Sequence, residues 1–336
     1  MKKSRVTVLG DGGWGTALAV VNARRQNDVM LWSAFPEYAK IIEAKRENVK
    51  FLPGVPLPSG IQVTSDIQAA LNFGDFVVLA IPTQFLRNVL FKIKDLSYSD
   101  KIFISVSKGI EKRTCLRPSE IVKSILGNAI HLVVLSGPSH AEETARNIPT
   151  LVVVASENEK DASRVREAFI DTCFRTYIQS DVIGVELGGA LKNVMAIAAG
   201  VSDGLGFGDN TKSGLITRGL LEMTRLGIRF NANPNTFFGL SGLGDLVTTC
   251  FSPHGRNLRV GRELGQGKKI KDILASMEMV AEGVDSAESV HELCKKVKLD
   301  LPIIGEVYQI LFRDKSPRQA VMDLLQRDAR EELKQY

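Results

Sequence analysis

The stretch that decides the fold is Arg5-Val6-Thr7-Val8-Leu9-Gly10-Asp11-Gly12-Gly13-Trp14-Gly15, followed by the apolar run Thr16-Ala17-Leu18-Ala19-Val20-Val21. Its first five residues predict a short strand, and the apolar run predicts a helix. The glycines between them are spaced G-x-G-x-x-G. Gly10 suits a tight turn, Gly12 lets a pyrophosphate approach the backbone, and Gly15 lets helix and strand pack closely. Because the free N–H groups at the helix start would face phosphates, the stretch predicts a dinucleotide-binding site.

The sugar end of that site is less well defined. The next predicted strand, residues 29–32, ends in Ser33-Ala34 rather than in an acid. An Asp or Glu about 20 residues after the glycines normally binds the ribose hydroxyls of NAD. No arginine stands there to bind the 2′-phosphate of NADP, and Lys40 and Arg46 are only distant candidates. The sequence therefore predicts NADPH or NADH as cofactor and leaves the preference open.

Strand and helix patterns alternate up to residue 178. Further strands are expected at 61–64, 75–81, 101–107, 131–135, 150–155 and 174–178, with helices at 83–93, 118–126 and 160–170. Apolar strands separated by helices predict an α/β fold with a doubly wound, mostly parallel sheet. Ligands on such sheets bind beyond the carboxyl ends of the strands, where Lys108 and the segment Ser136-Gly137-Pro138-Ser139-His140-Ala141 stand.

Beyond residue 180 the pattern is helical. Helices are expected at 181–199, 211–226, 234–250, 257–264, 270–277, 286–297, 303–312 and 317–333. Because 336 residues exceed the usual size of one domain, we predict two domains. These are a dinucleotide-binding domain over residues 1–180 and an all-helical substrate domain over residues 181–336.

Composition and charge narrow the classes of function that the protein can have. The formal charge of +5, from 43 basic and 38 acidic residues, is mild and scattered, which argues against nucleic acid and suits an anionic small molecule. Four distant cysteines without a C-x-x-C pair are typical of a reduced, cytoplasmic protein. The N-terminus does not resemble a signal peptide, and we expect no membrane span. The four histidines (His131, His140, His254 and His291) lack metal-type spacing, so no metal site is expected.

The first candidate for chemistry is Lys192, which stands with Asn193 in the small, apolar stretch 186–200. Such a stretch is expected to be buried, and a buried lysine is costly unless it has a partner or a function. Desolvation would make Lys192 a usable proton donor and acceptor, with Asn193 orienting a hydroxyl. The alternative is a lysine that extends to the surface from a domain interface.

Two further candidates follow in the helical half. Asp245 is the only charge in the glycine-rich segment 239–250, and Lys192 is its natural partner. The alternative for Asp245 is a cap for a helix that begins at Leu246. The turn Ser252-Pro253-His254-Gly255-Arg256-Asn257 places an arginine fork and a neutral donor at a helix start, which suits a phosphate.

Together these segments resemble the bacterial NAD(P)-dependent glycerol-3-phosphate dehydrogenases. The resemblance rests on seven blocks in the right order, which are residues 10–19, 106–111, 136–143, 186–200, 239–252, 256–257 and 282–284. It implies a Rossmann-type domain followed by a helical domain, and interconversion of dihydroxyacetone phosphate and glycerol 3-phosphate for phospholipid synthesis. It also implies a homodimer.

The resemblance also implies roles for single residues. Lys192 is similar to the general acid/base, and Lys108 to a second cation at the reacting oxygen. Substrate contacts are implied for Lys108, Gly137, Ser139, Lys192, Asp245, Gly255, Arg256 and Asn257. Cofactor contacts are implied for Gly10, Gly12, Gly13, Trp14, Gly15, Lys108, Ala141, Arg256, Val280 and Glu282. Two positions depart from the family pattern: Gly255 replaces a usual serine, and Ala34 replaces a polar or basic residue.

The expected reaction is transfer of a hydride to the ketone carbon, with Lys192 protonating the alkoxide, Lys108 adding charge, and Arg256 holding the phosphate. Two alternatives remain at this point. One is a related dehydrogenase of a hydroxy acid or a nucleotide sugar, against which Arg256-Asn257 argues. The other is a dinucleotide-sensing regulator, which the presence of Lys192 and Asp245 disfavours.

Overall fold

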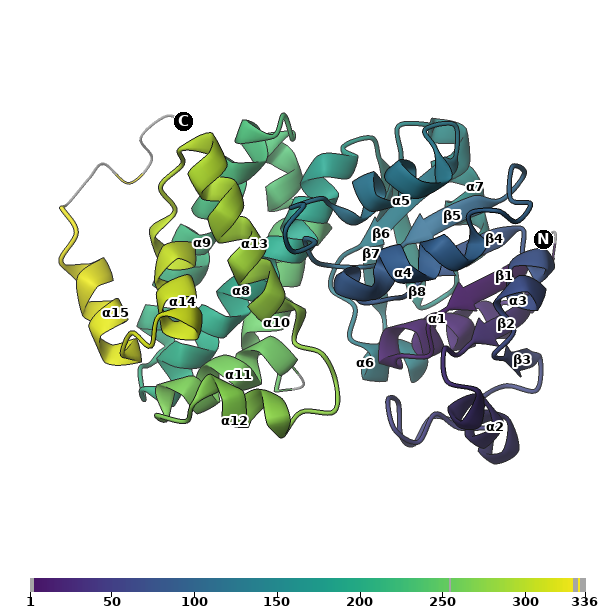
Figure 1. Cartoon of the computed structure of the whole chain (residues 1–336), viewed down its shortest axis with the longest axis horizontal. Coiled ribbons are helices and arrows are strands. Elements are labelled where there is room, and N and C mark those ends of the chain that lie inside the picture. The colour runs from purple at the N-terminus through teal and green to yellow at the C-terminus, as the bar shows by residue number, and fades with distance from the viewer. Residues whose placement is uncertain (1–2, 254, 329–331, 333–336) are drawn as a thin grey trace. The chain divides into compact units, whose positions relative to one another are not determined.

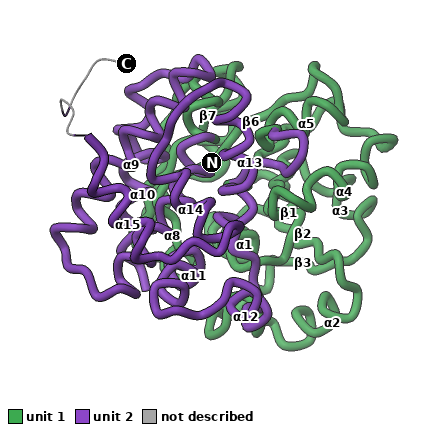
Figure 2. Tube along the Cα trace, turned by 60° about the vertical axis from the view of Figure 1, so that its left-hand side comes forward, with its two compact units in different colours: residues 1–108, 116–186 green, residues 109–115, 187–336 purple. Residues whose placement is uncertain are grey.

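The computed structural model describes residues 3–253, 255–328 and 332. The chain forms two compact units: unit 1 contains residues 1–108 and 116–186, and unit 2 contains residues 109–115 and 187–336 (Figure 2). These units and the predicted division at residue 180 differ in two places. Residues 181–186 belong to unit 1, and residues 109–115 belong to unit 2.

Unit 1 is built on a single sheet of eight strands in the order β3-β2-β1-β4-β5-β6-β7-β8. The strands are β1 (Arg5–Leu9), β2 (Asp28–Trp32), β3 (Ile61–Thr64), β4 (Phe76–Leu79), β5 (Ile102–Ser105), β6 (His131–Ser136), β7 (Thr150–Ala155) and β8 (Phe174–Gln179). All neighbouring pairs are parallel except β6 and β7. The chain moves outward from β1 in both directions, so the strand order reverses between β1 and β4.

Helices cover both faces of this sheet (Figure 1). They are α1 (Gly13–Arg24), α2 (Pro36–Lys45), α3 (Ile67–Phe73), α4 (Thr83–Ile93), α5 (Pro118–Leu126), α6 (Ala141–Ala145) and α7 (Glu159–Phe169). Strand β4 contributes side chains to the hydrophobic cores on both faces of the sheet, because successive side chains of a strand point to opposite faces. Phe76 and Val78 pack with Leu18 of α1, whereas Val77 and Leu79 pack with the side of α4 and α5. The predicted doubly wound, mostly parallel α/β fold is confirmed.

The regular secondary structure of unit 2 consists of helices, with no strand among its described residues. Its elements are α8 (Val182–Gly204), whose first residues belong to unit 1, α9 (Asp209–Arg229), η1 (Pro234–Phe238), η2 (Leu240–Gly244), α10 (Asp245–Phe251), α11 (Arg256–Gly265), α12 (Ile270–Ala275), α13 (Glu282–Val297), α14 (Pro302–Phe312) and α15 (Pro317–Leu325). The first turns of α14 and α15 each contain a proline, where its missing N–H removes no helical bond. The predicted helical character of this half is confirmed.

One predicted helix is wrong as a continuous element. Residues 234–250 form a 3₁₀ turn, a π turn and the start of α10 instead. The break comes at Gly239, whose extended backbone separates η1 from η2. Gly242 then packs so tightly that a Cβ there would lie 2.1 Å from the carbonyl oxygen of Phe237. Of the helix expected over 317–333, the part after Leu325 is not helical as far as residue 328, and most of the rest lies outside the described residues.

Helix α8 is the buried centre of unit 2. A Cβ on Gly200 would lie 2.1 Å from the oxygen of Leu258, and one on Gly261 would lie 2.0 Å from the oxygen of Ile197. The backbones of α8 and α11 therefore touch, which explains the small residues of α8. By length and composition alone α8 could cross a membrane, with a mean hydropathy of 1.5, but 89% of that window is buried inside the protein. A core helix passes the same test.

Candidate active site

The glycine turn of unit 1 has the shape that a dinucleotide phosphate needs. Gly10 adopts a φ of +117°, and a Cβ there would lie 2.3 Å from the oxygen of Ala80. A Cβ on Gly15 would lie 2.0 Å from the oxygen of Gly10, so α1 starts in direct contact with the turn. At Gly12, in contrast, a Cβ would meet no atom within 4 Å. The open side of the turn thus lies at Gly12, beside the reversal of strand order where such sheets bind ligands.

Two predicted cofactor contacts, Gly13 and Ala141, lie together next to the turn. A Cβ on Gly13 would lie 3.6 Å from that of Ala141 and 2.7 Å from the oxygen of Phe51. The indole Nε1 of Trp14 is buried and has no hydrogen-bond partner within the described part of the chain. A buried donor without a partner costs about 1–3 kcal/mol, so an acceptor supplied by a ligand is expected there. These features fit a bound dinucleotide.

Lys108 follows β5 and reaches the loop after β6. Its Nζ donates to the carbonyl oxygen of Gly137 at 2.9 Å and lies 3.4 Å from Oγ of Ser139. Gly137 has a φ of +135°, and a Cβ there would lie 3.1 Å from Cα of Val152, so glycine suits this position best. The ends of two neighbouring strands therefore bring together Lys108, Gly137 and Ser139.

In unit 2 Lys192 and Asp245 form a buried ion pair. Nζ of Lys192 lies 2.9 Å from Oδ1 of Asp245 and 3.0 Å from Oγ1 of Thr249. Only 8% of Lys192 and 2% of Asp245 are exposed, so each charge depends on the other for compensation. Burial raises the pKa of the neighbouring Cys250 thiol to about 12, which keeps it protonated.

Asn193 and Asn257 meet at the start of α13. The N–H of Gly283 donates to Oδ1 of Asn257 at 3.0 Å. A Cβ on Gly283 would lie 2.6 Å from the oxygen of Asn193, so α13 touches α8 next to Lys192. Since the oxygen of Asn257 is used in this bond, its amide NH₂ is the part suited to a ligand.

Arg256 opens α11 and also reaches the segment before α13. Its Nη1 lies 3.4 Å from the oxygen of Val280, and Glu282 follows as the first residue of α13. Gly255 precedes α11, and a Cβ there would lie 3.2 Å from Cβ of Leu258.

The predicted site residues fall into two groups, one in each unit. Unit 1 holds Gly10, Gly12, Gly13, Trp14, Gly15, Lys108, Gly137, Ser139 and Ala141; unit 2 holds Lys192, Asn193, Asp245, Gly255, Arg256, Asn257, Val280 and Glu282.

Sequence reasoning missed Thr249. It stands four residues after Asp245 on α10, so both side chains lie on one helix face and both reach Lys192. That i, i+4 spacing was the available signal. The alternative view of Asp245, as a cap for a helix starting at Leu246, differs from the structure, because α10 begins at Asp245 and its carboxylate contacts Lys192.

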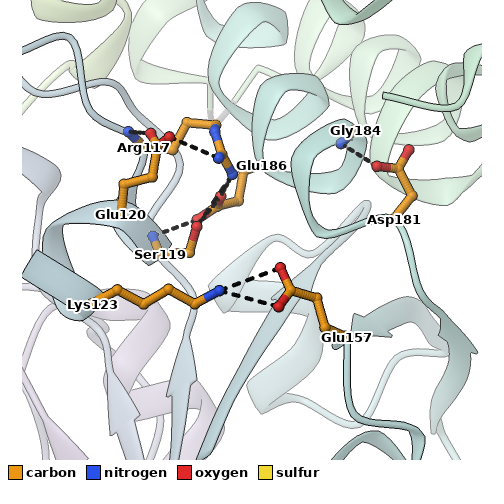
Figure 3. Close-up of polar contacts among 8 residues, drawn as sticks. All are labelled: Arg117, Ser119, Glu120, Lys123, Glu157, Asp181, Gly184 and Glu186. Atoms are coloured by element: carbon orange, nitrogen blue, oxygen red, sulfur yellow. Dashed lines mark hydrogen bonds and ion pairs between the residues drawn. The ribbon is translucent and has the colours of Figure 1, made fainter. Parts of the chain in front are cut away.

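A second missed residue is Glu186, six positions before Lys192 on α8. Its carboxylate accepts from the backbone N–H of Ser119 at 2.7 Å, from the Ser119 hydroxyl at 2.6 Å and from Nη1 of Arg117 at 2.5 Å (Figure 3). Burial raises the pKa of Glu186, and the Arg117 charge opposes that rise. These bonds fix the first turn of α8 to the start of α5.

No group of three or more His, Cys, Asp or Glu side chains suited to a metal ion is present in the described ranges. His131 instead pairs with Asp161 at 2.8 Å. His291 stacks on Tyr308 with ring centroids 3.7 Å apart. His254 lies outside the described residues.

Comparison with known proteins gives consistent matches over both halves. The family described as NAD-dependent glycerol-3-phosphate dehydrogenase N-terminus matches residues 5–162, and the one described as its C-terminus matches residues 181–322. A glycerol-3-phosphate dehydrogenase [NAD(P)+] of Chlorobium phaeobacteroides (strain BS1) is 45% identical, covering 98% of this chain and 99% of its own. One of Geobacillus kaustophilus is 48% identical, covering 98% and 96%. The crystal structure of glycerol-3-phosphate dehydrogenase from Coxiella burnetii has a TM-score of 0.93 and 38% identity, covering 97% of this chain and 99% of that one.

Proposed function

This chain belongs to the NAD-dependent glycerol-3-phosphate dehydrogenase family, and we propose that it reduces dihydroxyacetone phosphate to sn-glycerol 3-phosphate with Lys192 as the general acid. It is an oxidoreductase that uses NAD(H) or NADP(H). Because the chain belongs to this family, we set aside the alternatives of a dehydrogenase acting on a hydroxy acid or a nucleotide sugar and of a dinucleotide-sensing regulator. The observation that carries the proposed mechanism is the buried contact of Lys192 with Asp245 and Thr249.

The role of Lys192 follows from its three N–H donors. Asp245 and Thr249 accept from its ammonium at 2.9 and 3.0 Å, which leaves a third donor for the oxygen of a substrate carbonyl. When bound, the nicotinamide supplies the hydride that reduces the carbonyl carbon. Lys192 then gives its proton to the developing alkoxide and, in the reverse direction, takes it from the hydroxyl. Asn193, next to Lys192, is proposed to orient that hydroxyl.

Lys108 is proposed as the second cation. Its Nζ is held by Gly137 and Ser139, which places a positive charge at the carboxyl ends of β5 and β6. A fixed charge stabilises an oxyanion without reorganisation during the reaction. In unit 1 the turn from Gly10 to Gly15, with Trp14 and Ala141, is proposed to hold the dinucleotide.

The phosphate of the substrate is assigned to Arg256 and Asn257 at the start of α11. The guanidinium offers five donors in a planar fork, and the helix start adds backbone N–H groups. Binding the phosphate away from the carbonyl would position the reacting carbon and lower the barrier through binding energy. Gly255, which carries no hydroxyl, is proposed as a backbone contact only.

The Lys192 assignment is tested by following the loss of NADH and NADPH absorbance with dihydroxyacetone phosphate. Lys192→Ala should lose turnover by at least about 10²-fold while dinucleotide binding stays near normal. Lys268→Ala, which removes an exposed lysine paired with Glu263, is the control and should keep its activity. Near-normal turnover of Lys192→Ala would remove the assignment.

The phosphate assignment uses two arginines of the same helix. Arg256→Ala should raise KM for dihydroxyacetone phosphate strongly. Arg259→Ala removes an exposed arginine that pairs with Glu263 at 2.7 Å and should leave KM unchanged. Equal KM values for wild type and Arg256→Ala would exclude a phosphate role for Arg256.

We also propose a cytoplasmic homodimer whose product serves glycerophospholipid synthesis. This proposal rests on the family alone. Light scattering on the eluted peak of a sizing column measures the mass directly, and twice the chain mass of 36.8 kDa is expected. A peak at the single-chain mass would contradict the dimer.

A further inference from the structure

No acidic residue follows β2 in the sequence, yet the fold brings one to the carboxyl end of that strand. Ser33, the first residue after β2, donates its hydroxyl to Oδ2 of Asp11 at 2.7 Å. Asp11 belongs to the glycine turn after β1 and is only 7% exposed. A carboxylate therefore lies at the carboxyl end of β2, where dinucleotide folds usually carry their ribose-binding acid on β2 itself.

The fold holds Asp11 in this place. Strands β1 and β2 are neighbours in the sheet (Figure 1). Leu9 pairs with Trp32, and the N–H of Gly10 donates to the oxygen of Trp32 at 3.1 Å. The amide of Asn48 donates to the backbone oxygen of Asp11 at 2.6 Å, which fixes the turn from its other side. Because these bonds hold the backbone, the carboxylate keeps its position at the end of β2.

The basic side chains considered for a 2′-phosphate are already engaged. Lys40 pairs with Glu37 at 3.0 Å. Arg46 pairs with Glu43 at 3.0 Å and donates to the backbone oxygens of Pro58 and Ile61 at 2.7 and 2.9 Å.

One further basic residue bears on this end of the site. The positive charge of Lys50 opposes the rise that burial causes in the pKa of Asp11. Nζ of Lys50 lies 5.2 Å from the centre of the Phe51 ring. It is therefore the remaining basic candidate among these residues for binding a 2′-phosphate.

We propose that Asp11 takes the role of the missing β2 acid: it accepts the adenosine ribose hydroxyls and disfavours a 2′-phosphate, so that this chain prefers NADH to NADPH. A carboxylate has about four acceptor sites, so the bond from Ser33 leaves room for sugar hydroxyls. A 2′-phosphate would bring further negative charge against a largely buried carboxylate. The inference rests on the proposed function only in requiring a nicotinamide dinucleotide.

Binding without catalysis tests this proposal. Titration calorimetry on the full-length protein measures ADP-ribose and 2′-phospho-ADP-ribose, which carry no nicotinamide, and then NADH and NADPH. Wild type should bind the ligand without the 2′-phosphate at least about tenfold more tightly in each pair. Equal affinities, or tighter binding of the 2′-phosphorylated ligand, would overturn the proposal whatever the variants do.

Variants identify the residue responsible. Asp11→Asn keeps the size of the side chain and should bring the affinity ratio close to one, mainly by improving binding of the 2′-phosphorylated ligands. Glu159→Gln, which removes an exposed negative charge in the first turn of α7, is the control and should keep the wild-type ratio. A wild-type ratio in a folded Asp11→Asn protein would refute the role of Asp11.

Three further outcomes are decisive. If wild type binds NADPH tightly and the Lys50→Met protein loses that binding, Lys50 is a 2′-phosphate clamp and the proposal is wrong. If no dinucleotide binds to the folded wild-type protein, the proposed function itself fails. Tight NADPH binding with a normal reaction would instead leave the function in place and refute only the preference.

Discussion

Glu222 on α9 should make the protein less stable as the pH rises from about 5 to about 8. Its side chain is buried, and its two oxygens accept the backbone N–H groups of Ile303 and Ile304 at 2.8 and 3.2 Å, at the start of α14. Burial raises the pKa of Glu222 from 4.5 to about 7, against the opposing effect of these two hydrogen bonds. Between these two pKa values, Glu222 therefore holds a proton in the folded protein that the unfolded chain has already released.

The size of the effect follows from that shift. Between pH 4.5 and 7 folding takes up a proton, so stability is highest below the unfolded pKa and is lost as the pH rises through the folded pKa. One pKa unit corresponds to about 1.4 kcal/mol, so the loss between pH 5 and pH 8 amounts to about 2–3 kcal/mol. Glu222→Gln keeps the shape without the charge and should remove this loss.

The assay is urea unfolding of wild type and Glu222→Gln at several pH values from 5 to 8. The difference in unfolding free energy between the two proteins should change by about 2–3 kcal/mol across this range, in favour of the variant at high pH. Glu292→Gln is the control, because Lys295 lowers the pKa of Glu292 and its titration lies below this range. A constant difference for Glu222→Gln would mean that the two N–H bonds outweigh burial and that the carboxylate is ionised throughout.

Three more predictions concern single side chains. Asp245→Asn should lower kcat by about 10²-fold or more with dinucleotide affinity unchanged, because the buried ammonium loses its counter-charge; a wild-type kcat would contradict this. Gly15→Ala puts a methyl group 2.0 Å from a backbone oxygen and should abolish dinucleotide binding in calorimetry, whereas Gly60→Ala, with no atom within 4 Å, should bind normally. Glu186→Ala removes the acceptor of the buried Ser119 N–H and hydroxyl, while Arg117 keeps its pair with Glu120, and it should lower the unfolding free energy by about 1–3 kcal/mol; an unchanged urea midpoint would speak against it.

Much of the fold could be predicted because its signals are local. The turn from Gly10 to Gly15 follows from glycine spacing, and the alternation of strands and helices follows from the period of apolar residues. The contact between Lys192 and Asp245 could also be expected, since a buried lysine and a buried acid each need an opposite charge. The helix expected over 234–250 failed because its glycines permit tight packing against Phe237, which no helical period reveals.

The sequence by itself thus determined the fold class, the dinucleotide turn and the charged pair at the centre of unit 2. Only the tertiary structure decided which distant residues meet them. It brought Asp11 to Ser33 at the end of β2 and Glu186 to Ser119 at the start of α5. It also returned residues 109–115 to unit 2, where Lys112 pairs with Asp285 at 2.6 Å. These contacts join residues far apart in the chain, and they depend on strand order and helix packing rather than on any local pattern.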